Sequence, residues 1–331
     1  MITITALIIV TDRLSYLKEN INSLIKFNSD IFVVSNGYNK EIFNFLDATK
    51  KTYPKFDFKI IQEQVHKCRA RNIGIESVNS DVIYFLDDDT FMEQDNIKIL
   101  QEKFNLYPVG VIGGSNLTPK NSSRFQKLVG FMLSTPLMSY KMCNRYLSTG
   151  TDRFTDDTEL ILCNLAIKKE LFTKYNLKFN ERLHYNEENL LLEQIKKHGV
   201  RMLYSPNLNI YHHRRADIKS FLIQVYNSGK GRGIMSVIMP SSIKIFYFLP
   251  MLFVVYLILL ILQIMPLIFL NLYLIIVLYN VICVYFINKL KLLDISIMFL
   301  ISGLSHICYG VGLFIGLIQG ITYKKTNSPS L

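Results

Sequence analysis

Along the first ninety residues of the chain, short apolar runs typical of strands alternate with segments whose apolar residues recur at helical spacing. Four runs have the length and β-branched content of strands, and they cover residues 3–11, 29–36, 56–63 and 80–89. After the first run, apolar residues recur at the spacing of one helix face, at Leu14, Leu17, Ile21, Leu24 and Ile25. A further helix is predicted over residues 68–78. Strands that alternate with helices predict an α/β fold with a mostly parallel central sheet.

The pattern changes after Lys244, where a long stretch without any charged residue begins. Residues 245–288 contain no Asp, Glu, Lys or Arg, and this run is about twice the ~20 residues that cross a bilayer as a helix. Pro266 near its middle predicts two helices rather than one. The predicted helices cover about residues 245–265, 267–287 and 295–318. We therefore predict a soluble domain at 1–240, an all-α membrane anchor of two or three helices at 241–320, and a short polar tail at 321–331.

Charge and cysteine usage bear on where such a chain resides. The formal net charge is +11, and basic residues gather before the first apolar helix, in HHRRADIKSF and SGKGRG. Basic segments next to membrane helices are typical of the cytosolic side. The five cysteines form no CxxC pair, which fits a reducing compartment. The opening apolar run is too short for a signal peptide, and no nucleic-acid recognition motif accompanies the charge, so nucleic acid is not a predicted partner.

Three adjacent acids, Asp87, Asp88 and Asp89, end the fourth predicted strand. Parallel sheets bind ligands at the carboxyl ends of their strands. Crowded carboxylates are costly there unless a cation neutralises them, and hard divalent ions take oxygen ligands. Because side chains alternate along a strand, Asp87 and Asp89 are predicted to share a face. The pattern indicates a divalent metal site, and an acidic loop without a metal is the alternative. Phe91 breaks the spacing of the DxDx[TV] phosphatase and DDxxD prenyl-transfer motifs.

The order of these segments resembles the family-2 glycosyltransferases of the GT-A fold. The resemblance is carried by IIVTDR, VVSNGYN, CRARNIGI and FLDDD, in that order. Residues 161–199 are similar to the acceptor-side segment of the family, which has a Glu-Asp pair before a helix and a glycine. Residues 207–233 resemble the stretch before the membrane helices in members that build bacterial surface polysaccharides. The likeness covers about residues 2–233, and its segments are specific jointly rather than singly.

The resemblance implies a metal site and a donor site. It makes Asp87 and Asp89 the DxD motif that holds Mn²⁺ or Mg²⁺, and one histidine, His212 or His213, could complete the metal site. The implied donor contacts are Thr11, Arg13, Ser35, Asn36, Arg71, Asp87 and Asp88. The family usually has an Asp where this chain has Ser35-Asn36-Gly37. The nucleobase is therefore open, with a UDP-sugar as the first expectation and a dTDP-sugar as the second.

The resemblance also implies a general base on the acceptor side. Aligned on Gly199, Glu188 falls where the family has its Asp, so Glu188 is the predicted base and Glu187 supports it. A pair of first-turn residues favoured by the helix dipole is the alternative.

Two other segments carry weaker expectations. Gln224, Lys230 and Arg232 lie among three glycines and predict a mobile loop that closes over phosphate, with a contact to anionic lipid as the alternative. Residues 125–138 predict an amphipathic surface helix that touches the membrane or a lipid-borne acceptor. Asp156 and Asp157 are expected in a solvated loop.

Together these features predict an inverting, metal-dependent glycosyltransferase in the bacterial inner membrane, with its catalytic domain in the cytosol. The expected acceptor is a lipid-linked or growing glycan of a surface polysaccharide. A non-catalytic sugar-nucleotide-binding module is the competing class. The chain argues against it by retaining the residues expected for catalysis, which are Asp87, Asp89, Arg71 and Glu188. A processive synthase is a third possibility, but the chain has no QxxRW sequence and few helices for a channel.

Overall fold

The computed structural model describes residues 2–327, and side chains as far as Thr322. The chain divides into two compact units. Unit 1 comprises Met1–Lys120 and Asn144–His213, and unit 2 comprises Asn121–Cys143 and Arg214–Leu331. This division differs from the predicted boundary at residue 240, because unit 2 begins earlier and takes in a segment from the middle of the chain.

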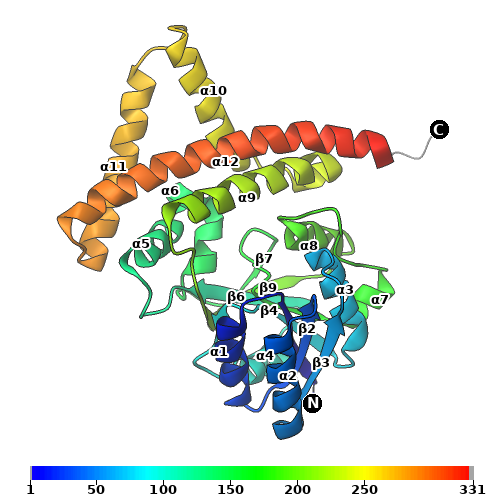
Figure 1. The fold of residues 1–331 in the computed structure, drawn as a ribbon. Helices are drawn as coiled ribbons and strands as arrows, with labels where there is room; N and C mark the ends of the chain where they lie inside the picture. The colour runs from blue at the N-terminus through cyan, green and yellow to red at the C-terminus, as the bar shows by residue number, and fades with distance from the viewer. Residues whose placement is uncertain (1, 328–331) are drawn as a thin grey trace. The chain divides into compact units, whose positions relative to one another are not determined.

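Unit 1 is built on one mixed sheet with helices around it (Figure 1). Its strands are β1 (Ile4–Val10), β2 (Asp30–Asn36), β3 (Phe56–Ile61), β4 (Val82–Asp87), β5 (Thr90–Phe91), β6 (Val111–Leu117), β7 (Arg153–Thr155), β8 (Asn164–Lys168) and β9 (Met202–His212). The order along the sheet is β3-β2-β1-β4-β8-β6-β9-β5, with β7 paired to β9. Strands β1 to β4 are all parallel, whereas β8 is antiparallel to both of its neighbours. The predicted α/β class with a mostly parallel sheet is confirmed.

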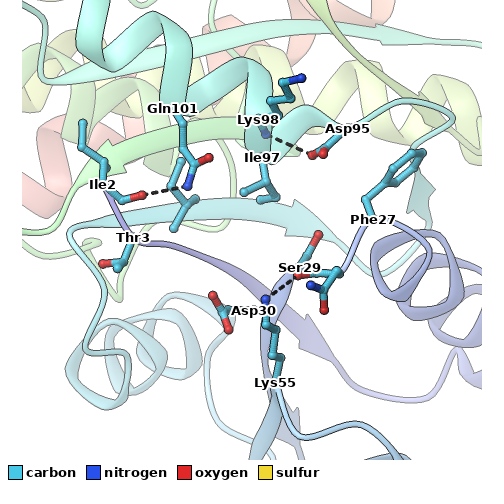
Figure 2. A pocket seen from close by; sticks show the side chains of 12 residues that line it. Ile2, Thr3, Phe27, Ser29, Asp30, Lys55, Asp95, Ile97, Lys98 and Gln101 are labelled. Carbon is cyan, nitrogen blue, oxygen red and sulfur yellow. Dashed lines mark hydrogen bonds between the residues drawn. The ribbon is translucent and has the colours of Figure 1, made fainter.

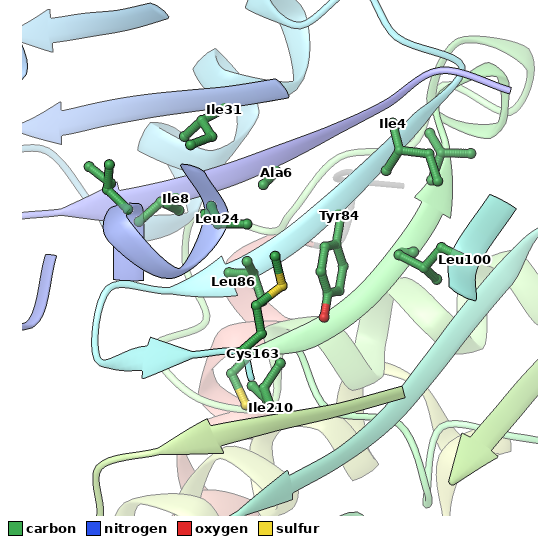
Figure 3. Packing of buried hydrophobic residues seen from close by; sticks show 14 of the residues in the cluster. Ile4, Ala6, Ile8, Leu24, Ile31, Tyr84, Leu86, Leu100, Cys163 and Ile210 are labelled. Carbon is green, nitrogen blue, oxygen red and sulfur yellow. The ribbon is translucent and has the colours of Figure 1, made fainter. Parts of the chain in front are cut away.

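The helices of unit 1 cover the sheet and bury its apolar side chains. They are α1 (Leu14–Ile25), α2 (Lys40–Thr52), α3 (Lys67–Ser77), α4 (Asn96–Leu106), α7 (Glu170–Lys174) and α8 (Glu187–Lys197). Figure 3 shows Ile8 of β1 and Leu86 of β4 in the core near Leu24 of α1. Tyr84 is fully buried there, and its hydroxyl donates to Asn164 Oδ1 at 2.6 Å. A buried tyrosine is tolerated because this bond satisfies its polar end.

The register of the parallel strands brings distant residues to one edge of the sheet. Val10 of β1 pairs with Ser35 of β2, and Ile9 pairs with Asp87 of β4. The carboxyl ends of β1, β2 and β4 therefore meet, and the residues that follow them lie at the same edge. This edge is where an α/β sheet binds its ligands.

A hollow of about 500 Å³ lies at the opposite edge, where the same strands begin (Figure 2). Thr3, Asp30 and Lys55 line it together with residues around the start of α4, such as Asp95 and Lys98. Because these residues are at the amino ends of the strands, the hollow is separate from the edge that gathers the acidic residues.

Unit 2 is helical in the part of the chain that the structure describes. Its helices are α5 (Arg124–Leu133), α6 (Pro136–Ser139), α9 (Ile218–Ile238), α10 (Leu249–Ile261), α11 (Ile268–Asn288) and α12 (Leu292–Asn327), with 3-10 turns η1 (Tyr140–Tyr146), η2 (Pro240–Ser242) and η3 (Ile245–Phe248). Val129 and Met132 of α5 pack with Val281 of α11 and Ile301 of α12 in one buried cluster. The segment predicted as an amphipathic surface helix is thus part of the helical unit.

Two helices, Ile268–Asn288 and the Leu292–Thr322 part of α12, are long and apolar enough to cross a membrane. The predicted helix at 245–265 is shorter in the structure, because residues 245–248 form the turn η3 before α10. The predicted polar tail at 321–331 is helical as far as Asn327, and its last four residues lie outside the described part of the chain.

The loop predicted around Gly229 and Gly233 is wrong, because these residues lie inside the helix α9. A Cβ on Gly229 would lie 2.2 Å from the carbonyl oxygen of Tyr309 in α12, and one on Gly233 would lie 2.4 Å from that of Leu313. Glycine lowers helix propensity in isolation, but here it lets two helix backbones touch. The glycines therefore serve helix packing rather than loop mobility.

Candidate active site

The acids at the end of β4 form a cluster with a histidine from the end of β9. One ligand atom each from Asp87, Asp89 and His212 lies within 4.8 Å of the others. The pairing of Thr90 in β5 with His212 in β9 brings the histidine there. The neighbouring His213 instead faces Glu19, with 2.7 Å between Nε2 and Oε2. Of the two predicted histidines, His212 is the one in the cluster.

The cluster has donor atoms that fit a divalent cation. Asp89 Oδ1 is buried without a hydrogen bond and lies 3.2 Å from His212 Nε2. Carboxylate oxygens suit Mg²⁺ and Mn²⁺, and imidazole nitrogen is a common ligand of transition metals such as Mn²⁺. These three side chains can therefore hold either ion.

Arg13, which follows β1, binds two of the three acids at the end of β4. Its guanidinium bonds to Asp88 and Asp89, with Nε 3.1 Å from Asp88 Oδ2. Burial raises the pKa of Asp88 to about 7, although Arg13 opposes the shift. Burial also acts to raise the pKa of Asp89, but His212 and Arg13 outweigh it and hold this pKa below its usual value. Asp89 is therefore ionised at neutral pH.

Arg71 joins the acidic cluster to the acceptor-side segment. Its guanidinium lies 2.7 Å from Glu187 Oε1 and 3.8 Å from Asp87 Oδ1. Lys67, one turn earlier in α3, places its Nζ 2.6 Å from the same oxygen of Glu187. Burial acts to raise the pKa of Glu187, but Arg71 and Lys67 outweigh it and lower this pKa. Two cations of α3 thus hold the first residue of α8 as a buried carboxylate.

Glu188 follows Glu187 in the first turn of α8 and has the opposite electrostatic environment. Burial and then the charge of Glu187 raise the pKa of Glu188, while Arg145 opposes the shift. Arg145 is itself buried and donates to the carbonyl oxygens of Thr158, at 2.7 Å, and Asp157, at 2.6 Å. The two neighbouring glutamates therefore differ, and Glu188 is the stronger base once it is ionised.

The predicted donor contacts after β1 and β2 share the sheet edge with the cluster. Thr11 is partly exposed there, whereas Ser35 is buried and donates to the carbonyl oxygen of Gly37 at 3.0 Å. Both ends of the Asn36 amide are bound to the backbone of Val65, each at 2.9 Å. Asn36 thereby shapes the loop between β3 and α3.

Some predicted residues lie elsewhere, and some residues of the site were not predicted. Gln224, Lys230 and Arg232 lie in α9 of unit 2, and their contact with a donor stays a prediction. Asp157 was expected in solvent but is buried, because Asn189 of α8 and Arg145 bind its carbonyl oxygen. Sequence reasoning missed Lys67 and Arg145. Lys67 had a signal, since it lies four residues before Arg71 on one helix face.

Comparisons with known proteins give the family of this chain. The family model described as "Glycosyl transferase family 2" matches residues 5–172, which is half of the chain. A sequence comparison with curated proteins finds no match.

Several solved structures have a similar fold at low sequence identity. The mannosyltransferase PcManGT from Pyrobaculum calidifontis, in complex with GDP-Man and Mn²⁺, is similar over 99% of this chain and 76% of its own, with a TM-score of 0.54 and 9% identity. The structure of GalNAc-T7 with UDP, GalNAc and Mn²⁺ is similar over 73% of this chain and 51% of its own, with a TM-score of 0.52 and 16% identity.

S. aureus TarS gives a TM-score of 0.51 and 11% identity over 70% of this chain, which spans 40% of the TarS chain. The complex of TarS residues 1–349 with UDP-GlcNAc gives the same score over 66% of that chain. With the family match over half of its length and the same type of fold in these glycosyltransferases, the chain belongs to glycosyl transferase family 2 and has a GT-A-type domain.

Proposed function

We propose that this protein is a metal-dependent, inverting glycosyltransferase that moves a sugar from a nucleotide donor to a glycan or lipid-linked acceptor. The observation that carries the proposal is the contact of one buried guanidinium, that of Arg71, with Asp87 on one side and Glu187 on the other. This contact supports a single site that contains both the acids at the end of β4 and the glutamates at the start of α8. The similar structures with UDP-GlcNAc or with GDP-Man and Mn²⁺ support a nucleotide-sugar donor.

In this proposal Glu188 is the general base. Its ionised carboxylate takes the proton of the acceptor hydroxyl, whose oxygen forms a bond to the anomeric carbon of the sugar. The bond from that carbon to the diphosphate oxygen breaks, and the nucleoside diphosphate leaves with the electron pair. Attack opposite the leaving group inverts the anomeric centre. Glu187 supports this role because its buried charge raises the pKa of Glu188.

The residues at the end of β4 would serve the leaving group. Asp87, Asp89 and His212 would hold Mn²⁺ or Mg²⁺, and the bound ion would offset the charge of the departing diphosphate. Thr11, Arg13 and Ser35 at the same edge would contact the base and ribose. A UDP-sugar is the first candidate donor and a dTDP-sugar the second.

The helical unit supports a membrane setting. Two of its helices are long and apolar enough to cross a bilayer, and we place unit 1 in the cytosol on the inner membrane of a bacterium. A lipid-linked intermediate of a surface polysaccharide would be the acceptor there.

The test is a transfer assay with a panel of radiolabelled UDP-, dTDP- and GDP-sugars and a membrane extract as acceptor, with Mn²⁺, Mg²⁺ or chelator. Metal-dependent transfer, or slow metal-dependent hydrolysis of one donor, supports the proposal. Binding of a donor without either reaction would favour a non-catalytic module. Long polymer from a single binding event would favour a processive synthase.

A further inference from the structure

Helices α9 and α12 pack against each other through glycines on both helices. A Cβ on Gly312 would lie 2.1 Å from the carbonyl oxygen of Tyr226, and one on Gly316 would lie 2.0 Å from that of Lys230. Real Cβ atoms do not come this close to other heavy atoms, so no larger side chain fits at these two glycines. The two helix backbones are therefore in direct contact. Glycine at such contacts is typical of helix pairs that form in membranes.

The same contacts show that the two helices run in the same direction. Tyr226 meets Gly312 and Lys230 meets Gly316, and a Cβ on Gly320 would lie 2.8 Å from Val237 Cβ. Residue numbers rise together along both helices over this whole stretch. Figure 1 shows α9 and α12 side by side. Residues 226–237 and 309–320 therefore lie at equal depth in any membrane that the pair enters.

Helix α9 is long enough to cross a bilayer but too polar. It has 21 residues, yet it is not among the described helices that are apolar enough to span. Lys219, Lys230 and Arg232 lie along it, and a charge at the centre of a bilayer is costly. The Arg232 guanidinium lies over the Tyr247 ring, 4.1 Å from its centroid, within unit 2. Arg232 is buried within unit 2, whereas Lys219 is exposed, and this exposed charge suits the membrane surface better than the hydrocarbon. Through its packing, α9 keeps the second half of α12 at the same depth.

Helix α12 has the length and pattern of a helix that lies in the surface layer. Its apolar part has 31 residues, which is roughly 46 Å of helix against about 30 Å of hydrocarbon. Its exposed large apolar residues recur on one face, at Leu300, Val311, Phe314, Ile318 and Ile321. The glycines that meet α9 lie on another face. Asp294 in its first turn is buried and paired with Arg124 Nε at 2.6 Å.

The hairpin of α10 and α11 argues against a crossing by α12 in this packing. Helix α10 begins against α12, since a Cβ on Gly310 would lie 2.3 Å from the carbonyl oxygen of Pro250. Helix α11 ends at Asn288, just before α12 begins. Helix α10 has 13 residues, about 20 Å, which is too short to cross the hydrocarbon. If the hairpin enters and leaves the bilayer on one side, α9 ends on the side where α12 starts. If α12 crossed from there, its parallel partner α9 would have to end on the far side.

We propose that α9 and α12 lie flat as a pair in the surface layer of the cytosolic leaflet, and that α12 does not cross the membrane. Acyl chains cover the exposed apolar stripe of α12, and the α10–α11 hairpin enters the hydrocarbon. This inference rests on the membrane association proposed above and assigns the helices different roles in it. Both ends of α12 then lie on the cytosolic side of the membrane.

The test locates the two ends of α12 in the full-length protein. Lys289→Cys is probed with a membrane-impermeant maleimide in intact cells and in inside-out vesicles, and the unaltered chain gives the background of the five native cysteines. A reporter that fluoresces only in the cytosol is fused after the last residue. We expect maleimide labelling only in inside-out vesicles, together with a fluorescent fusion.

Lys289 and the fused reporter on opposite sides of the membrane would overturn the inference, because α12 would then cross. That result would leave the proposed transferase activity untouched. A full-length protein that stays soluble after high-speed sedimentation would refute the membrane association itself, and this inference with it.

Discussion

At the scale of single residues, neighbouring acids in this site differ because their surroundings differ. Asp88 and Asp89 are both buried, but His212 lies beside Asp89 alone. Glu187 has two cations on one oxygen, whereas Glu188 has the charge of Glu187 beside it. The direction of each pKa shift follows from the balance between burial, which favours the neutral acid, and the charges nearby.

Asp89→Ala should abolish the metal-dependent part of donor binding and transfer. The variant removes the carboxylate nearest His212, whereas Asp88→Ala should cost less because Asp88 binds Arg13 and lies outside the cluster. Titration calorimetry with nucleotide and Mn²⁺ measures the loss. Asp47→Ala, at an exposed surface pair, is the control. Equal transfer by the unaltered protein in excess chelator would rule out the metal.

Glu188→Gln should lower turnover by about 10²–10⁴-fold, because the amide keeps the shape but cannot take a proton. Donor affinity should change little, and thermal stability should hold since the variant removes a half-buried charge beside that of Glu187. Glu187→Gln should instead lower stability, by roughly 1–3 kcal/mol, because Arg71 and Lys67 lose their shared carboxylate. Thermal unfolding and turnover of both variants separate the roles. Near-normal turnover of Glu188→Gln would place the base elsewhere.

The raised pKa of Glu188 predicts a pH dependence of turnover. The base works only when ionised, so turnover should fall as the pH falls through its raised pKa, and the decline should begin above the ordinary value of 4.5. Initial rates across pH with saturating donor and metal measure it. The residual rate of Glu188→Gln should lack this acid limb. An acid limb that persists unchanged in the variant would assign it to another group.

At the scale of elements, glycine has different roles in α12 at different positions. A Cβ on Gly316 meets the backbone of α9 at 2.0 Å, whereas one on Gly303 meets nothing within 4 Å. Gly316→Ala should therefore cost about 1–3 kcal/mol by overpacking, and the matched Gly303→Ala should stabilise by about 0.5–1 kcal/mol through helix propensity. Thermal unfolding in detergent compares them. Equal effects of both variants would contradict the close packing of α9 on α12.

At the scale of the whole molecule, unit 2 is assembled from two separate parts of the chain. The segment 121–143 leaves unit 1 and packs with α11 and α12, so that Val129 and Met132 are buried against Val281 and Ile301. Removal of the last helices therefore exposes apolar surface on parts of the chain that remain.

Truncation after Lys244 should accordingly give a protein that aggregates or stays with membranes. The fragment would not be a cleanly soluble domain, because α5 and α9 would lose α11 and α12 as partners. Sedimentation and gel filtration without detergent, beside the full-length protein in detergent, measure the outcome. A monodisperse soluble fragment would show that α5 and α9 need no partner.

Much of this protein follows from its sequence because the decisive signals are local. The four parallel strands and α1 follow from periods of two and 3.6 residues within single segments, and the crowding of Asp87 and Asp89 indicates a candidate cation site. The charge-free run after Lys244 also indicates a membrane-type helical unit, because its length and lack of charge are visible within one segment.

Other features depend on which segments meet, and only the tertiary structure decides that. His212 reaches Asp89 because β5 pairs with the far end of β9, and Lys67 matters only because α8 places Glu187 beside it. The glycines close to Gly229 in sequence predict a loop. In the structure Gly229 instead lies in the helix α9, where it packs directly against the backbone of α12. Local patterns record the preferences of a segment, whereas long-range contacts depend on pairing across many residues, which no single window of the chain contains.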